Sequence, residues 1–131
     1  MPEKEGLLPL LPEFMAFGPK ERPMNPESPF FTIEGLPSDF LRPGTERRSI
    51  RLGEVLFMFI SFDRPTVSPS HDHPWDSIIY VDRGEFEMTV GDQQRRLAPG
   101  EGTIVPAGVR HTLTTGPGSR LIEVWYPMKQ T

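Results

Sequence analysis

The stretch that decides the fold begins with HDHPWDSIIYVDRG (residues 71–84) and ends with PGEGTIVPAGVRH (residues 99–111). It holds all three histidines of the chain, His71, His73 and His111. Side chains two residues apart on a strand point to the same face, so His71 and His73 are expected to converge. Pro106 and Gly108 suit a tight turn, which would return His111 beside them. Imidazoles that converge in this way are good donors for a divalent first-row metal ion. A barrel whose histidines bind no metal is the open alternative.

Outward from this stretch, the chain is divided by residues that break helices. It has 16 Pro and 12 Gly in 131 residues, and proline costs about 3 kcal/mol inside a helix. Short strands joined by tight turns therefore remain, and their count suits an all-β jelly-roll barrel in which two sheets close over a cavity. The expected strands are 30–34, 47–52, 55–62, 77–81, 85–90, 95–98, 102–105, 112–114 and 120–126.

The N-terminal 29 residues differ from the rest in composition. They hold seven of the prolines together with apolar residues between Leu7 and Phe17. A pure linker would be polar, so we expect an extended arm over residues 1–29 that lies on the domain or on a neighbouring subunit. A disordered tail is the alternative. Residues 30–131 are then the barrel domain.

Composition excludes some classes of binding partner. The net charge of −4 and the pI near 5.4 give no basic surface for nucleic acid or for an anionic membrane. No apolar run approaches the roughly 18 residues that span a bilayer. The charged start, followed by Pro9 and Pro12, argues against a signal peptide. The expected location is therefore the cytoplasm, and the expected partner is a small molecule.

The two motifs resemble those of the cupin superfamily, in its small, single-domain, RmlC-like form. The family motifs read roughly G-x5-H-x-H-x3,4-E-x6-G and G-x5-P-x-G-x2-H-x3-N. The residues that match are His71, His73 and Gly84 in the first motif, and Gly100, Pro106, Gly108 and His111 in the second. The resemblance covers about residues 48–127. It implies a small β-barrel (the double-stranded β-helix), often dimeric, with a metal near the barrel axis.

The chain departs from these motifs at three positions. Ser77 stands where the family has its glutamate ligand, Pro65 replaces the first glycine, and Thr115 replaces the last asparagine. The resemblance then implies a three-histidine variant of the metal site, with one divalent ion per chain (Fe, Mn, Ni or Zn). Asp76, one residue before Ser77, becomes a further candidate ligand if a bulge turns its side chain inward.

These features predict a metal-dependent cupin that acts on a small oxygenated, anionic molecule. Three-histidine members of the family include thiol dioxygenases and a diketone-cleaving dioxygenase, which favours a dioxygenase by analogy. A metal-dependent isomerase or lyase is the alternative, as is a cupin that binds a small molecule without turnover. Trp75 and Ser77 are candidates for the pocket wall.

Other residues are weaker candidates. Arg51, Arg64 and Arg110 could each bind a substrate carboxylate, and Tyr80 could donate a proton, although its parity is opposite to that of the histidines. Six residues are expected in the core rather than the pocket: Phe57, Phe59, Phe86, Met88, Trp125 and Tyr126. The apolar run 55–62 suggests a homodimer, because a barrel of this size has little interior to cover it.

Overall fold

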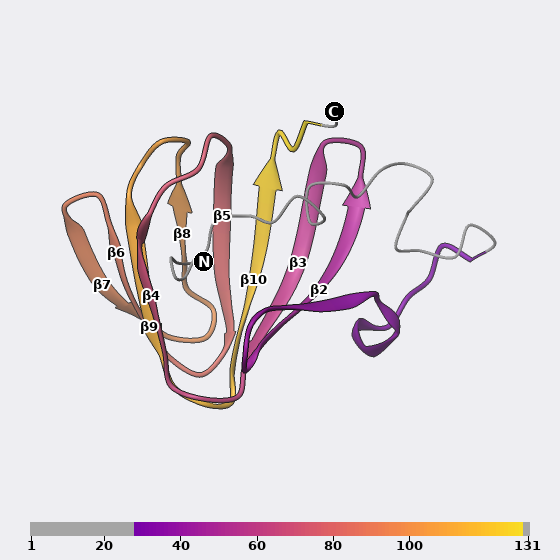
Figure 1. Ribbon diagram of the computed structural model, residues 1–131, viewed down its shortest axis with the longest axis horizontal. Coiled ribbons are helices and arrows are strands. Elements are labelled where there is room, and N and C mark those ends of the chain that lie inside the picture. The colour runs from indigo at the N-terminus through magenta and orange to yellow at the C-terminus, as the bar shows by residue number, and fades with distance from the viewer. Residues whose placement is uncertain (1–27, 130–131) are drawn as a thin grey trace.

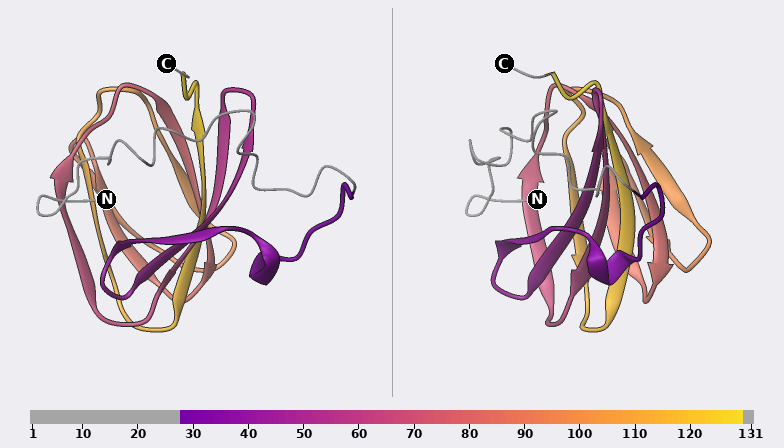
Figure 2. Two further views of the ribbon diagram at one scale, coloured as in Figure 1. Left: turned by 45° about the vertical axis from the view of Figure 1, so that its right-hand side comes forward. Right: turned by 90° about the vertical axis from the view of Figure 1, so that its right-hand side faces the viewer.

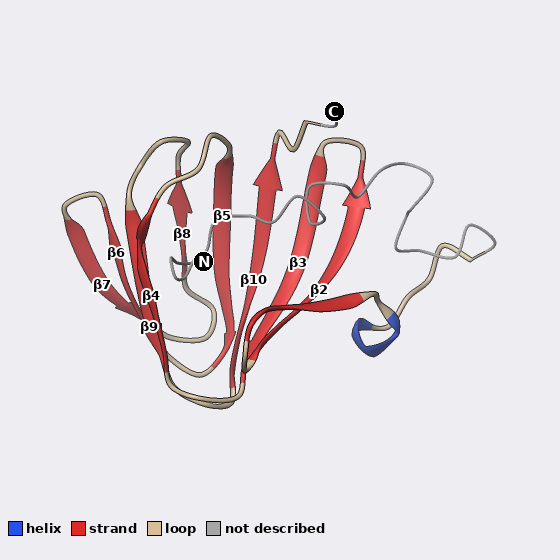
Figure 3. Cartoon of the chain, in the orientation of Figure 1, coloured by secondary structure: helices blue, strands red, loops and turns tan. Residues whose placement is uncertain are grey.

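Ten strands form two antiparallel sheets in this chain, whose computed structural model describes residues 28–129 (Figures 1 and 3). The larger sheet has the order β1-β2-β3-β10-β5-β8 and the smaller has the order β4-β9-β6-β7. The larger sheet consists of β1 (Ser38–Arg42), β2 (Thr45–Leu52), β3 (Val55–Phe62), β10 (Ser119–Tyr126), β5 (Asp76–Arg83) and β8 (Gly102–Val105). The smaller sheet consists of β4 (Thr66–His71), β9 (His111–Thr115), β6 (Phe86–Val90) and β7 (Gln93–Leu97). The predicted all-β jelly roll is confirmed.

The core lies between the two sheets, which curve round a common interior (Figure 2). The alternation of buried and exposed residues along each strand produces this arrangement, because successive side chains of a strand point to opposite faces. On β10, for example, Leu121, Glu123 and Trp125 are buried while the residues between them are partly exposed. Phe86 and Met88 are in the core as expected, whereas Phe57 lies on the other face of β3 and Tyr126 is exposed.

The first expected strand, residues 30–34, is wrong. The chain instead forms a single 3₁₀ turn at Ile33–Gly35, where Oγ1 of Thr32 accepts a hydrogen bond from the Gly35 amide (3.1 Å). A threonine that caps a turn in this way competes with strand pairing. The stretch that follows was expected to be all turns, yet it contains β1, an edge strand whose mostly exposed residues give no apolar alternation.

Strand β4 is missing from the expected set because two prolines, Pro65 and Pro69, lie at or within it. Pro69 is tolerated because β4 is an edge strand of the smaller sheet. The pairing of β4 with β9 also shifts register between Ser68 and His71. This irregular edge strand carries the first histidine of the candidate site.

Residues 1–27 lie outside the described residues, so the predicted N-terminal arm is not described. No helix in the described part is long and apolar enough to cross a membrane.

Candidate metal centre

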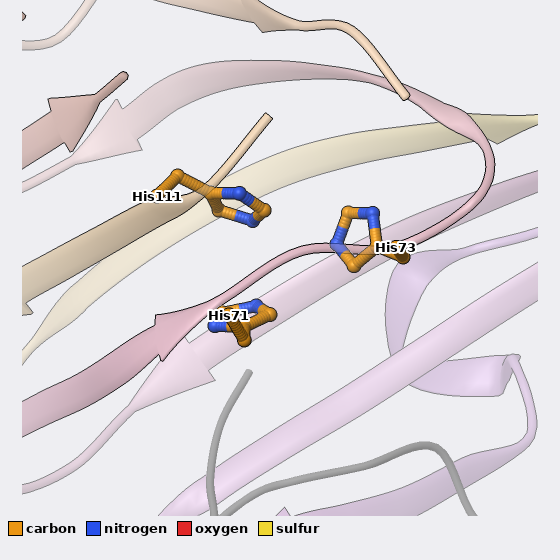
Figure 4. A group of neighbouring side chains, drawn as sticks. All are labelled: His71, His73 and His111. Carbon is orange, nitrogen blue, oxygen red and sulfur yellow. The ribbon is translucent and has the colours of Figure 1, made fainter. Parts of the chain in front are cut away.

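His71, His73 and His111 come together where β4 ends and β9 begins (Figure 4). Their candidate ligand atoms all lie within 4.8 Å of one another. The ring centroids are 4.3 Å apart for His71 and His111, and 4.8 Å apart for His73 and His111. His73 and His111 are buried and His71 is half-buried. The convergence that the sequence predicted is therefore present in the fold.

Strand pairing places two of these rings, and backbone carbonyls orient them. His71 at the end of β4 is the direct partner of His111 at the start of β9. Nδ1 of His71 lies 2.8 Å from the Pro69 carbonyl, and Nδ1 of His111 lies 2.9 Å from the Val109 carbonyl. A carbonyl only accepts, so each Nδ1 carries the proton and each Nε2 keeps a free lone pair. This is the arrangement in which histidine binds a metal.

His73 reaches the cluster from a loop, not from the strand that its spacing suggested. Strand β4 ends at His71, and His73 lies in the segment that leads to β5. The loop is held by the second motif, because the Gly108 amide donates to the His73 carbonyl (2.8 Å). Gly108 has φ of +81°, a conformation that favours glycine. The Pro-x-Gly turn thus positions His73 as well as returning the chain to His111.

At neutral pH the three imidazoles are uncharged, so each can offer a nitrogen lone pair to a metal ion. Burial lowers the pKa of His71 to about 2 and that of His73 to about 3. Burial also lowers the pKa of His111. Nε2 of His73 is buried and has no hydrogen-bond partner, although buried polar atoms normally have one. Three lone pairs on convergent neutral nitrogens, one of them otherwise unsatisfied, fit a divalent first-row ion.

Two tryptophans form an apolar wall beside His73. Trp75 stacks on the His73 ring with a centroid distance of 4.8 Å and an interplanar angle of 9°. Trp125 contacts both, at 5.3 Å from His73 and 4.7 Å from Trp75. Both tryptophans are almost fully buried. Trp75 is therefore a core residue that also forms part of the wall beside His73.

Ser77 and Glu123 form a buried polar pair next to this wall. Oγ of Ser77 donates to Oε2 of Glu123 (2.7 Å), and Nε1 of Trp125 donates to the same oxygen (2.7 Å). Glu123 is only 4% exposed, and its charge acts on His111 to favour the protonated imidazole. Sequence reasoning missed Glu123. Its signal was a lone carboxylate at an inward position of the apolar strand β10.

The remaining candidates are exposed or already bound to other groups. The Asp76 side chain is exposed, and its carboxylate accepts from the Ala107 amide (2.9 Å) in the Pro-x-Gly turn. Arg51 is buried and donates to the carbonyls of Gly53 and Met128. Arg64 pairs with Asp63, Arg110 binds Ser70, and Tyr80 is 45% exposed.

Comparison with known proteins gives one family and many similar structures. A family model described as "Cupin domain" matches residues 58–124, about half of the chain. KdgF from Halomonas sp. superimposes with a TM-score of 0.70 at 28% identity, over 76% of this chain and 94% of that one. An RmlC-like cupin from Shewanella frigidimarina has a TM-score of 0.70 at 26% identity, over 76% and 91%. No curated protein matches the sequence.

A more distant structure shares the fold alone. Bacillus subtilis oxalate decarboxylase, studied for its Mn(II) centres, has a TM-score of 0.65 at 14% identity. The alignment covers 77% of this chain and 30% of the decarboxylase.

Proposed function

The chain belongs to the cupin family, and from this premise we propose that it is a metal-dependent enzyme acting on a small, oxygenated, anionic molecule. One observation carries the proposal, namely the convergence of three neutral imidazoles within 4.8 Å. Three ligands leave coordination positions open, as catalytic sites require. A +2 ion with no carboxylate ligand also attracts anionic oxygens more strongly than a site that holds one.

Within this class, Glu123 favours proton transfer. A bound ion would supply Lewis acidity, which polarises a substrate carbonyl and makes the neighbouring C–H bond more acidic. Glu123 is then the base that removes that proton. Ser77 and Trp125 both donate to Oε2 of Glu123, which leaves Oε1 to accept it. Isomerisation or elimination is accordingly the reaction type that these residues support best.

The burial of the site supports the same chemistry. Trp75 and Trp125 exclude water from one side of His73. Removing water strengthens electrostatic interactions inside a site and protects reactive intermediates from side reactions. A buried carboxylate between two hydrogen-bond donors also keeps a fixed direction, so the base is positioned before substrate arrives.

Oxygen-dependent cleavage is the second candidate. The observation that favours it is the ligand set, because the cluster of described residues contains histidines and no carboxylate. The resemblance to three-histidine dioxygenases has the same basis. Oxygen uptake by iron-loaded protein would support this reaction, and proton exchange without oxygen uptake would support the first.

Metal content tests the proposal. Protein purified without a histidine tag should carry about one divalent ion per chain, measured by elemental analysis before and after reconstitution. His111→Ala should lose the ion but keep its β-sheet circular dichroism. Thr112→Ala, the adjacent residue on β9, should keep both. Wild-type protein that stays free of metal after reconstitution would contradict the proposal and favour a non-catalytic binding cupin.

Solvent exchange tests the role of Glu123. In D₂O, metal-loaded protein should exchange the α-protons of small keto acids faster than buffer does, as followed by proton NMR. Glu123→Gln should slow this exchange by about 10²–10⁴-fold. Glu87→Gln, an exposed control on β6, should not. Equal rates for both variants would exclude Glu123 as the base.

A further inference from the structure

A cavity of about 280 Å³ lies where the two sheets fail to join, between edge strands β7 and β8. We call it the β7–β8 pocket. Its volume is just below the usual range for small-molecule sites. Its lining includes the apolar side chains of Met88, Val90 and Leu97 and the polar side chains of Gln93, Arg95 and Thr103.

Strand register puts one lining residue of this pocket, Val90, beside His111. Val90 on β6 is the direct partner of His111 on β9, so the two side chains are neighbours on one face. Arg95 is the partner of Met88, two residues before Val90. Two strand spacings and two residues separate the Cα atoms of Arg95 and His111 by about 12 Å. Both side chains can therefore contact one small molecule.

Arg95 differs from the other arginines of the described residues in having no partner among them. Within residues 28–129 it forms neither an ion pair nor a hydrogen bond, whereas Arg96 beside it pairs with Glu85 (3.6 Å). Arg95 has the parity of the buried Leu97, and Arg96 has the opposite parity. No acidic residue lines the pocket. Arg95 thus lines the pocket as an exposed guanidinium to which the other lining residues offer no counter-charge.

We propose that Arg95 binds the carboxylate of an organic acid in the β7–β8 pocket. The guanidinium fork matches a carboxylate bidentately, Gln93 and Thr103 can bond hydroxyl groups, and the apolar lining contacts the carbon chain. The proposal rests on the proposed function in one respect: the far end of the acid must reach the histidine centre. The separation then fits a hydroxy or keto acid of about four to six carbons.

Calorimetry with a matched pair of probes tests the proposal. D-gluconate carries a carboxylate, and sorbitol has the same carbon chain without one. Gluconate should bind wild-type protein and sorbitol should bind at least about tenfold more weakly, because a charged hydrogen bond is lost. Arg95→Gln should weaken gluconate binding about tenfold or more. Arg96→Gln, its neighbour on the other face, should bind as wild type does.

The proposal for the β7–β8 pocket and the proposal for the metal centre can be tested independently. Measurements on metal-free and zinc-loaded protein distinguish them, since metal content is determined on the same samples. Binding that depends on Arg95 in metal-free protein supports the pocket even if no ion is retained. Gluconate that does not bind wild type, or that binds Arg95→Gln equally well, would overturn the proposal. Arg95 is exposed, so circular dichroism of Arg95→Gln should match that of wild type.

Discussion

At the scale of single residues, the site combines three uncharged imidazoles with one buried carboxylate, that of Glu123. The carboxylate of Glu123 is stabilised by hydrogen bonds from Ser77 and Trp125, because an ionised group costs free energy inside a protein unless it is hydrogen-bonded. The serine at the family's glutamate position thus has a structural reason. It supports a carboxylate from a different strand.

Ser77→Ala should therefore lower stability without releasing the metal. Loss of a hydrogen bond to a charged group costs about 1.5–3 kcal/mol, measured as the free energy of unfolding in urea. Ser49→Ala is the control, since Ser49 is equally buried and forms no hydrogen bond to Glu123. Its cost should be clearly smaller. If Ser77→Ala lost its metal, Ser77 would be a ligand and this role would be wrong.

At the scale of elements, glycine turns hold the strands that carry the site. Gly84 joins β5 to β6 with φ of +79°, and a Cβ added there would lie 2.5 Å from Cβ of Ser119. Gly118 has a similar φ of +83°, but an added Cβ would meet nothing within 4 Å. The motif glycine is thus required by both conformation and space, and Gly118 by conformation alone.

Alanine substitutions at Gly118 and Gly84 separate the cost of backbone conformation from the cost of the steric clash. Gly118→Ala should cost about 1–2 kcal/mol of unfolding free energy, from backbone conformation. Gly84→Ala should cost at least about 1 kcal/mol more, because a steric clash is added. Urea unfolding of both variants checks the difference. Equal costs would mean that Ser119 moves aside without penalty.

The same elements show what the sequence could predict. Pro and Gly favour turns and so indicate where strands end. Most strands were therefore predicted to within two residues, and β3 and β8 with their observed bounds. β1 and β4 were missed, because edge strands need no apolar alternation and tolerate proline. The histidines were found by motif spacing. Glu123 and Arg95 were not, since only the folded sheets bring β10 and β7 to the same side of the barrel as those histidines.

At the scale of the whole molecule, the outer face of the larger sheet carries an apolar row. A cross-strand row runs Ile50, Phe57, Val124, Ile78 and Ile104, and Ile78 and Ile104 are 54% and 67% exposed. Four strands of eight residues and one of four present about 600 Å² in projection, against about 800 Å² per partner in a standard interface. We expect a second copy of the chain to cover this face.

Light scattering coupled to gel filtration tests that expectation. Wild-type protein should elute as a dimer, and a variant carrying both Ile78→Lys and Ile104→Lys as a monomer, because buried like charges would oppose pairing. Val67→Lys is the control: Val67 is 70% exposed but lies on β4 of the other sheet. A monomeric wild type, or a double variant that stays dimeric, would contradict the expected interface.

X-ray absorption at the edge of the bound metal, on reconstituted wild-type protein, tests the central claim most directly. The account predicts three imidazole nitrogens at about 2.0–2.2 Å, completed by water or buffer oxygens. A protein carboxylate in the first shell, such as that of Asp76, would contradict it, as would fewer than three imidazoles in the wild type.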